Sequence, residues 1–229
     1  MRASAPPSAS AGASVRLRRH QVREDLQEMI LTGEQKPGSK LLQQELATRF
    51  GVAQGVVREA LLELQAHGLV ETIDNRGIFV TDLSREKIIE AFQVREMHEA
   101  LAVRLCCERA ARSELRPLEE MAREICDLGA AKRLDQMARL DREFHARLIQ
   151  LSRHSMLNRL AENYRVLGKF VQASRAPKIV REEHLAILSA IERGAADEAE
   201  RLMREHVAAA RLEVETKLAS GKTKLQWVM

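Results

Sequence analysis

Four residues in the second half of the chain have side chains that could hold a metal ion together. Asp141 and His145 are four residues apart, so a helix would place both side chains on one face. His184 and His206 lie at similar distances before and after Gly194, so antiparallel helices joined there would bring the two imidazoles to similar height. One carboxylate and three imidazoles suit a borderline divalent ion, with Zn²⁺ preferred and Ni²⁺ or Mn²⁺ as alternatives. The competing interpretation pairs buried histidines with nearby glutamates (Glu182, Glu183 or Glu205).

A second group of polar residues, in the first third of the chain, could contact nucleic acid. Five arginines precede the first acidic residue (Arg2, Arg16, Arg18, Arg19 and Arg23). Arg16 and Arg18 would reach phosphates from such a basic arm, and a solvated charged tail is the alternative. Net charge is +4, so the total charge by itself does not select a partner.

A polar stretch between two apolar helical patterns could read DNA bases. It begins at Ala53 and includes Gln54 and Gly55, with Arg58 one helical turn later. At the start of a second helix these residues would enter the major groove, where Gln54 could pair with adenine and Arg58 with guanine or phosphate. Packing without DNA, with Arg58 paired to a neighbouring glutamate, is the alternative.

The elements that must position these residues follow from hydrophobic periodicity. A helix, a short helix, a three-residue turn, a second helix and a two-stranded hairpin are predicted in that order (15–31, 43–50, 53–67 and 69–80). This is a helix-turn-helix followed by a hairpin wing, whose tip carries Arg76 and Gly77 towards the DNA backbone or minor groove.

From Ser84 onward the pattern is helical. Ser84 is a predicted N-cap, Pro117 is expected in the first turn of the next helix, and Gly194 separates the last two helices. Six helices are expected, the last four of them at 134–151, 155–173, 180–193 and 196–219. The predicted fold is therefore mainly α: an N-terminal winged helix-turn-helix with a small β-hairpin wing and a C-terminal antiparallel six-helix bundle.

Composition limits the remaining possibilities. The 229 residues are predicted to form a disordered tail (1–14), a DNA-binding domain (15–82) and an all-helical domain (83–229). No apolar segment is long enough for a transmembrane helix, so no membrane partner is expected. Three cysteines without a CxxC motif indicate reduced thiols and a cytoplasmic location.

The N-terminal motifs resemble the winged-helix domain of the GntR family of bacterial transcription regulators. They are Ile30-Leu-Thr-Gly33, Lys36-Pro-Gly-Ser39, Phe50-Gly-Val52, Val57-Arg-Glu-Ala-Leu61, Gly68-Leu-Val70 and Arg76-Gly77. The resemblance implies a homodimer on a pseudo-palindromic double-stranded operator. Members commonly have Ser-Arg-Thr-Pro where this chain has Ala53-Gln54-Gly55-Val56, and an arginine that some members carry falls on Gln44. The operator sequences of other family members therefore cannot be transferred to this protein.

The second half resembles the FCD ligand-binding domain of the FadR subfamily, in its shorter VanR-like branch. The motifs are Val94-Arg95 with Glu99, Leu140-Asp-Arg-Glu-Phe-His145, Glu183-His184-Leu-Ala-Ile-Leu188 and Ala199 to His206. The resemblance implies that residues 83–229 form a ligand-binding and dimerisation domain, that Asp141, His145, His184 and His206 bind the metal, and that the effector is a small organic acid. Arg95 would hold its carboxylate, or else pair with Glu99. His154 stands where many members have Asn, at the pocket rim or a helix N-cap.

These features predict a transcription regulator, more specifically a repressor, whose operator affinity is modulated by an organic acid bound at a metal site. Two alternatives use the same residues differently. A metal-dependent hydrolase would use the Asp/His cluster for catalysis, although no general base is evident beside it. A purely architectural DNA binder would use its helical domain only to dimerise.

Overall fold

The computed structural model describes residues 9–82, 84–165 and 175–220 of the chain. The chain divides into two compact units, residues 1–82 and 83–229. Each unit has its own hydrophobic core.

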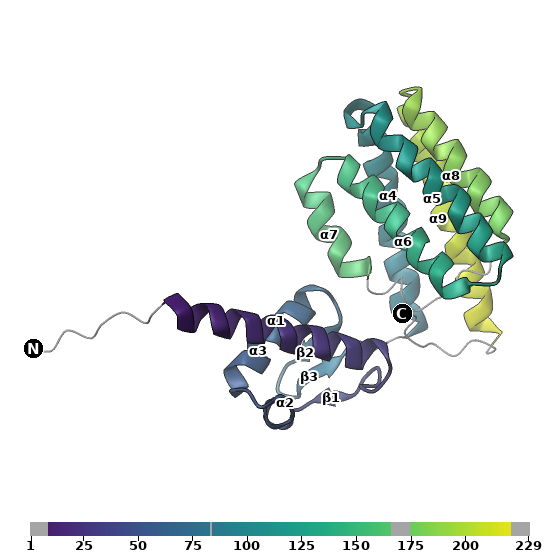
Figure 1. Cartoon of the computed structure of the whole chain (residues 1–229). Helices are drawn as coiled ribbons and strands as arrows, with labels where there is room; N and C mark the ends of the chain where they lie inside the picture. The colour runs from purple at the N-terminus through teal and green to yellow at the C-terminus, as the bar shows by residue number, and fades with distance from the viewer. Residues whose placement is uncertain (1–8, 83, 166–174, 221–229) are drawn as a thin grey trace, which may run out of the picture. The chain divides into compact units, whose positions relative to one another are not determined.

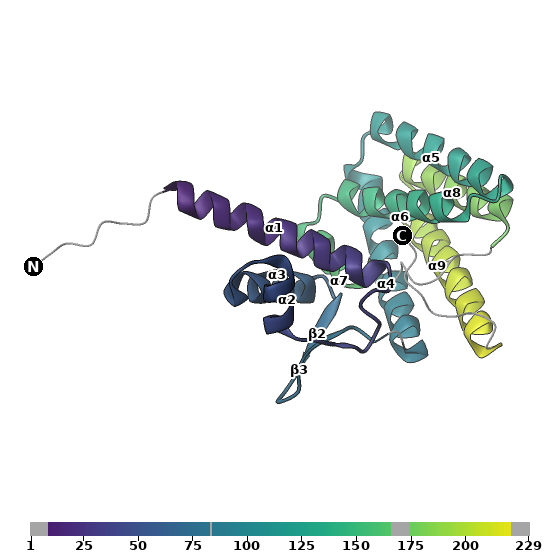
Figure 2. The ribbon, with the colours of Figure 1, turned by 60° about the horizontal axis from the view of Figure 1, so that its bottom comes forward.

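The first unit is a winged helix-turn-helix. Its elements are α1 (Ala9–Leu31), β1 (Lys40–Leu41), α2 (Gln43–Phe50), α3 (Gln54–Ala66), β2 (Val70–Ile73) and β3 (Gly77–Val80). The strands form an antiparallel sheet in the order β1-β3-β2, and the β2–β3 loop projects beyond α2 and α3 (Figure 2). α1 packs along α3, burying Leu26 and Ile30 with Leu61 and Leu64. This packing fixes the direction of α3.

The turn between α2 and α3 depends on one glycine. Gly51 adopts a left-handed backbone conformation with φ of 63°, which ends α2 and would be strained for other residues. Val52 N–H then donates to the Ala47 carbonyl, which closes the turn. Together these features direct the first residues of α3 away from the helical core.

Two differences from the sequence prediction concern the first unit. α1 begins at Ala9, so residues 9–14, expected in a disordered tail, are helical; their alanines favour the helix. The strand β1 was not predicted, because two residues are too few to show an alternating pattern. β1 forms because Lys40 and Leu41 pair with Phe79 and Ile78 of β3. Residues 1–8 of the expected tail lie outside the described part.

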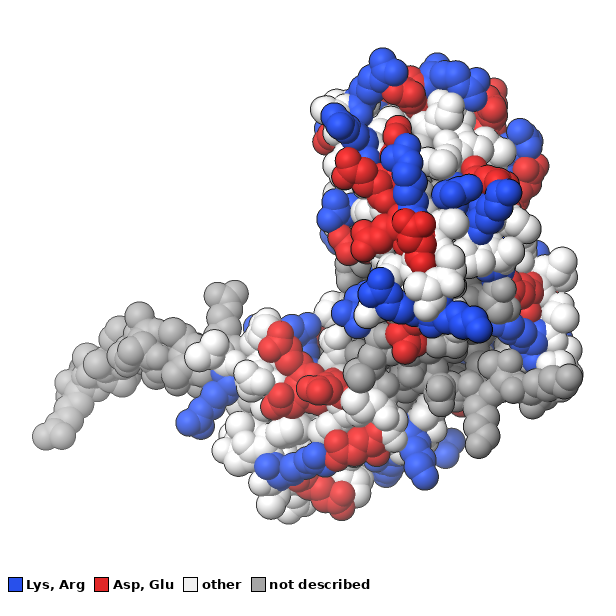
Figure 3. Space-filling model, turned by 45° about the vertical axis from the view of Figure 1, so that its right-hand side comes forward, with Lys and Arg blue, Asp and Glu red and all other residues white. Residues whose placement is uncertain are grey.

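The second unit is a helical bundle. Its six described helices are α4 (Arg85–Arg109), α5 (Arg112–Ala130), α6 (Leu134–Leu151), α7 (Ser155–Arg165), α8 (Pro177–Glu192) and α9 (Ala196–Ala219). α4 packs against α9, α6, α7 and α8, and α5 against α6 and α8 (Figure 1). Lys and Arg side chains alternate with Asp and Glu over the face drawn in Figure 3, as expected for the solvent side of amphipathic helices.

Helix ends in this unit agree with the predicted caps in two places. Ser84 accepts a hydrogen bond from Lys87 N–H, as an N-cap does, and Gly194 has a φ of 68° between α8 and α9. The expectation for Pro117 was wrong, because α5 begins at Arg112 and places Pro117 inside the helix. Glu114 explains the earlier start, since its carboxylate accepts from Ala111 N–H and stabilises the first turn.

A close contact between α5 and the start of α8 also depends on glycine. A Cβ atom at Gly129 would lie 2.4 Å from Cγ of Pro177 and 3.0 Å from Sδ of Met137. Only glycine allows this approach. The helix expected at 155–173 is observed as far as Arg165, and residues 166–174 lie outside the described part.

Candidate metal centre and nucleic-acid interface

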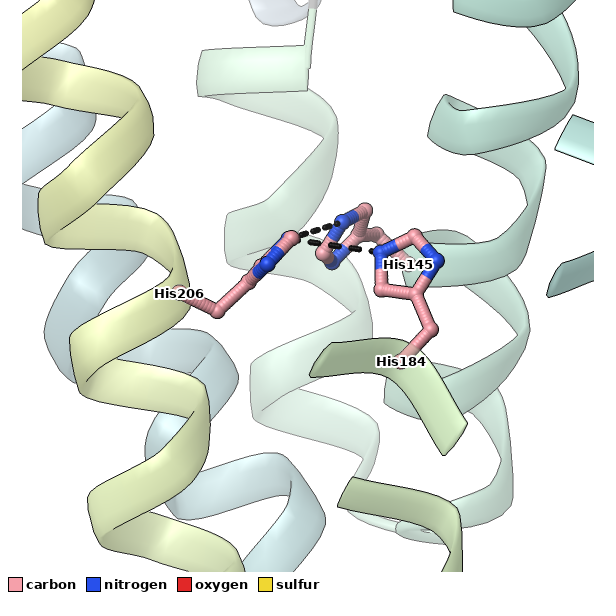
Figure 4. Close-up of side chains that lie close together, drawn as sticks. All are labelled: His145, His184 and His206. Carbon is pink, nitrogen blue, oxygen red and sulfur yellow. Dashed lines mark hydrogen bonds between the residues drawn. The ribbon is translucent and has the colours of Figure 1, made fainter. Parts of the chain in front are cut away.

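Three histidines from three helices meet in the core of the helical unit (Figure 4). Nε2 of His206 on α9 lies 3.3 Å from Nε2 of His184 on α8 and 3.3 Å from Nε2 of His145 on α6. All three side chains are buried, and one ring nitrogen of each lies within 4.8 Å of the others. Phe144 stacks on His184 with ring centroids 4.0 Å apart and so limits how that imidazole can rotate.

Asp141 completes this group from the same face of α6 as His145. Its Oδ2 lies 3.9 Å from His145 Nε2, and its Oδ1 lies 3.6 Å from His184 Nε2. The Asp141 carboxylate thus lies beside two of the three imidazoles that converge here. This donor set fits a borderline divalent ion such as Zn²⁺.

Two glutamates contact the far sides of two of these imidazoles. Glu99 Oε2, from α4, lies 2.8 Å from His145 Nδ1, and Glu183 Oε2, from α8, accepts a hydrogen bond of 2.7 Å from His206 Nδ1. A carboxylate hydrogen-bonded to Nδ1, as Glu183 is to His206, selects the tautomer whose Nε2 lone pair is available to a metal. The Glu99–His145 contact is an ion pair. The pair of Glu183 with His206 is one that the competing interpretation expected, so that interpretation is correct about this contact. Because the contact uses Nδ1 and leaves Nε2 facing the other imidazoles, it is also compatible with metal binding. Nδ1 of His184 is buried and has no hydrogen-bond partner in the described part.

Charge at the centre is set by burial and by these carboxylates. Burial alone would raise the pKa of Glu99, but Arg95 and His145 lower it well below its usual range. Burial would likewise raise the pKa of Glu183, but hydrogen bonds from His206 and Arg175 lower it to about 2. Both carboxylates are therefore ionised at neutral pH.

The histidines differ in protonation. Burial and the neighbouring His206 and His145 lower the pKa of His184 well below its usual value. Burial also lowers the pKa of His206, despite its contact with Glu183. For His145, burial is outweighed by Glu99, and the pKa is raised. Neutral His184 and His206 need lose no proton to bind a metal.

A cavity of about 60 Å³ adjoins this centre. Its volume is enough for roughly four water molecules. Asp141, His145 and His206 line it, together with three arginines (Arg95, Arg142 and Arg175) and apolar side chains that include Phe92 and Val180. The cavity therefore has guanidinium groups beside the candidate metal ligands, although Arg95 and Arg175 are already paired with glutamates and Glu213 also lines it.

Arg95 forms the i,i+4 pair considered from the sequence, and its side chain also borders the cavity. Its Nε donates to Glu99 Oε1 over 2.9 Å, and its guanidinium lies over the Phe92 ring, 5.1 Å from the centroid. The i,i+4 pair and an inward position are thus compatible.

The residues predicted to read DNA are all exposed in the first unit. Gln54, Gly55 and Arg58 lie along the beginning of α3, and Gln44 lies on α2. Gln44 and Gln54 line a surface groove of about 600 Å³, together with Lys40 and Gly77. Glu59 and Glu63, considered as partners of Arg58, pair instead with Arg19 and Arg23 of α1.

The hairpin tip places basic side chains at the edge of the same groove. Arg76 is exposed and lies over the Phe79 ring at 5.4 Å, with Lys40 at 5.9 Å from that ring. Gly77 has a φ of 110°, and a Cβ there would lie 3.1 Å from Lys40 Cε. Glycine is required at this position by its backbone angle.

The basic arm is divided between two roles. Arg18 is exposed on α1, whereas Arg19 and Arg23 form ion pairs with α3. Arg16 is in α1, and its side chain lies outside the described part. Only part of the arginine cluster is therefore in a position to meet phosphate.

Sequence reasoning missed several residues of these sites. Lys40 lies directly after the Pro-Gly-Ser turn, and this position could have indicated a groove residue. Glu99 was considered only as a partner of Arg95. Arg175 pairs with Glu183 and lines the cavity, but no motif or spacing in the sequence indicated that it belongs to the site. His154 was not missed: of the two positions considered for it, the pocket rim and a helix N-cap, it occupies the cap, since its Nδ1 accepts a 3.2 Å hydrogen bond from Leu157 N–H.

Comparison with known proteins decides the family. The model of bacterial regulatory proteins of the gntR family matches residues 18–80, and the model of the FCD domain matches residues 90–209. The chain belongs to the GntR family. It is a GntR-family transcription regulator with an FCD domain, and this excludes the hydrolase alternative.

Curated relatives agree with this assignment. The chain is 31% identical to the HTH-type transcriptional regulator YdhC of Bacillus subtilis, covering 69% of this chain and 73% of that protein. It is 29% identical to the Nta operon transcriptional regulator of Aminobacter aminovorans, covering 75% and 82%. It is 27% identical to the HTH-type transcriptional repressor RspR of Escherichia coli, covering 75% and 77%.

Solved structures show the same fold. The chain superposes on McbR/YncC of E. coli with a TM-score of 0.66 at 20% identity, covering 88% of this chain and 98% of that one. A GntR regulator from Rhodococcus gives a TM-score of 0.65 at 22% identity, covering 90% and 99%. Among the described residues, no helix combines the length and the apolar character that crossing a bilayer would require.

Proposed function

We propose that this GntR-family regulator is a homodimeric repressor whose affinity for operator DNA changes when a small organic acid binds beside a metal ion. The observation that carries the proposal is the convergence of Asp141, His145, His184 and His206 next to a cavity lined by arginines. A mainly apolar cavity with a few convergent polar groups is the usual form of a small-molecule site.

In this proposal the four residues hold a divalent ion, with Zn²⁺ preferred over Ni²⁺ and Mn²⁺. When bound, the ion would supply a Lewis-acidic position for an acid's carboxylate. Glu183 holds His206 in the tautomer that binds metal, and Glu99 forms an ion pair with His145. Arg95 offers a guanidinium to the same anion, because planar guanidinium and carboxylate groups can form two parallel hydrogen bonds.

DNA recognition is assigned to the first unit. Gln54 and Gly55 would enter the major groove, with Arg58 contacting a guanine or a phosphate. Arg76 and Gly77 of the wing, and Gln44 on α2, would contact the adjacent backbone, as would Arg16 and Arg18 of α1. Support comes from the exposure of the described side chains in this set and from the groove that three of the residues line.

Effector control requires the acid to favour one conformation over another. A ligand changes an equilibrium only by the difference in its affinity for the two states. A coupling of about 1–3 kcal/mol would change operator affinity ~5–150-fold. The segment around residues 81–84 joins the two units and would transmit this coupling.

The test compares His184→Ala with His154→Asn, a control in the same unit that preserves a side-chain acceptor at the α7 cap. Metal content is measured on the purified full-length proteins, and operator binding is measured with and without a panel of carboxylic acids. We expect metal in the wild type and the control, loss of metal and of acid response in His184→Ala, and DNA binding in all three. A metal-free wild type, or a full acid response in the metal-free variant, would contradict the proposal and favour a helical domain that only dimerises.

A further inference from the structure

One face of α4 is apolar and exposed at its centre. Val94, Met97 and Leu101 have exposed fractions of 52%, 58% and 41%. Several other large hydrophobic side chains of the described residues are exposed as well, but no other described helix has three of them. Because they are spaced three and four residues apart, they form one stripe along the helix.

The stripe continues in both directions with charged residues at the same spacing. Its full set is Lys87, Glu90, Val94, Met97, Leu101, Arg104 and Glu108, with alternating steps of three and four residues. None of the seven is buried. The spacing is that of a coiled-coil seam, along which a second helix can pack, but only the three central positions are apolar and the four outer ones are charged.

The charges along the stripe would pair with opposite charges on a second copy that runs in the opposite direction. An antiparallel second copy centred on Met97 would place Val94 opposite Leu101, Glu90 opposite Arg104 and Lys87 opposite Glu108. A parallel second copy would place each charge opposite the same charge, which is unfavourable. The charge pattern therefore favours the antiparallel orientation, in which two copies form the self-complementary, two-fold contact that is usual in homodimers.

Neighbouring elements support the same surface. Arg104 already contacts Asp197 and Glu200 of α9, so its guanidinium is held in place at the edge of the stripe. Arg204, also on α9, contacts Sδ of Met97. On the other flank, α7 packs against α4 and carries Met156 and Leu160, which are 49% and 46% exposed. Apolar side chains at the centre with charged side chains around them are typical of a protein interface.

We infer that a second copy of this chain docks antiparallel along this α4 stripe, with Met97 on the two-fold axis. The inference deepens the proposed function, on whose homodimer it rests, by naming the surface. The 25 residues of α4 span about 37 Å, which is long enough for the seven positions to meet their counterparts.

The first experiment measures dimer dissociation of the full-length protein by analytical ultracentrifugation. Met97→Glu should raise the dissociation constant roughly 30-fold or more, as loss of a central interface residue does. Ile179→Glu is the matched control, because Ile179 is 50% exposed on α8, and it should leave the dimer unchanged. Lys87→Glu should weaken the dimer, and adding Glu108→Lys should restore it.

The second experiment tests the register and does not require a dissociated chain to remain folded. In a Cys107→Ser, Cys126→Ser background, Met97→Cys should crosslink efficiently to its own copy with a short bis-maleimide. Ile179→Cys in the same background should not. The remaining Cys106 is buried and so is poorly accessible to the reagent.

The outcomes separate this inference from the proposed function. A wild-type dimer that Met97→Glu leaves intact, with no crosslink at position 97, overturns the α4 surface and leaves the proposed homodimer standing. A wild-type protein that is monomeric at concentrations that saturate the operator contradicts both. Weakening by Met97→Glu together with the position-specific crosslink supports the surface and its register.

Discussion

The two units place their polar residues in opposite ways. In the winged helix-turn-helix, Gln44, Gln54, Arg58 and Arg76 are exposed, and the core behind them is apolar. In the helical unit, the polar residues of interest are buried: Glu99 is 2% exposed and His184 is fully buried. A surface that meets DNA forms its hydrogen bonds with the partner, whereas a buried site must satisfy its polar atoms internally or with a bound ion.

This difference determines how each unit responds to substitution. Removing an exposed DNA-contacting side chain changes binding and leaves folding largely intact, because surface changes usually have small effects on stability. Removing a member of the buried group leaves its neighbours unpaired, and this affects the fold as well as binding. The predictions below test that contrast, beginning with the largest expected effect.

Metal removal should have the largest effect, and it should be confined to the helical unit. With free metal at about 1,000 times its dissociation constant, binding stabilises the folded state by about 4 kcal/mol. Adding a chelator should therefore lower the melting temperature of the wild type. His145→Ala should melt at the same temperature with and without chelator. A wild-type melting temperature that does not respond to chelator would contradict the metal assignment.

Glu99→Gln should weaken metal binding without removing a ligand. Loss of a carboxylate that orients a metal-binding imidazole typically reduces affinity 10–100-fold, here by weakening the hold on His145. Glu96→Gln, on the same helix but paired with Arg211, is the control and should bind normally. Competition with a fluorescent zinc chelator measures both variants. Equal affinities would show that the Glu99–His145 contact is only structural.

Gln54→Ala should change which operator the protein prefers while leaving the helical unit unaffected. A good bidentate contact to a base gives about 1–3 kcal/mol of discrimination, so preference at one position in each half-site should relax by that amount. Selection from a randomised DNA library measures it, and metal content should not change. An unchanged preference would mean that Gln54 does not read a base.

Arg18→Ala should have the smallest effect. Loss of one phosphate contact should reduce the slope of log affinity against log salt by about 0.9 per half-site and weaken all sequences alike. Arg19→Ala removes ion pairs with Glu59 and Glu63, so it should lower the melting temperature of the first unit more than Arg18→Ala does. Identical salt slopes for Arg18→Ala and wild type would exclude Arg18 from the phosphate contacts.

Several parts of this protein could be predicted from the sequence because their signals are local. The helices α2 and α3, the left-handed Gly51 between them and the hairpin each depend on residues close together in the chain. The pairing of Asp141 with His145 follows from helical geometry alone. The spacing of His184 and His206 around Gly194 predicted that they lie at the same level, family resemblance assigned them to the same metal site, and their imidazoles meet in the structure.

Tertiary structure decided the features that join distant segments. The strand β1 exists because β3 pairs with it, and α5 begins a turn early because Glu114 caps it. Glu99 is 46 residues from His145, and no local pattern shows that packing of α4 against α6 brings their side chains within 2.8 Å. The sequence thus determined which helices form and which residue types each one carries. Burial and packing decided which of those side chains meet, because contact between separate helices depends on the whole core.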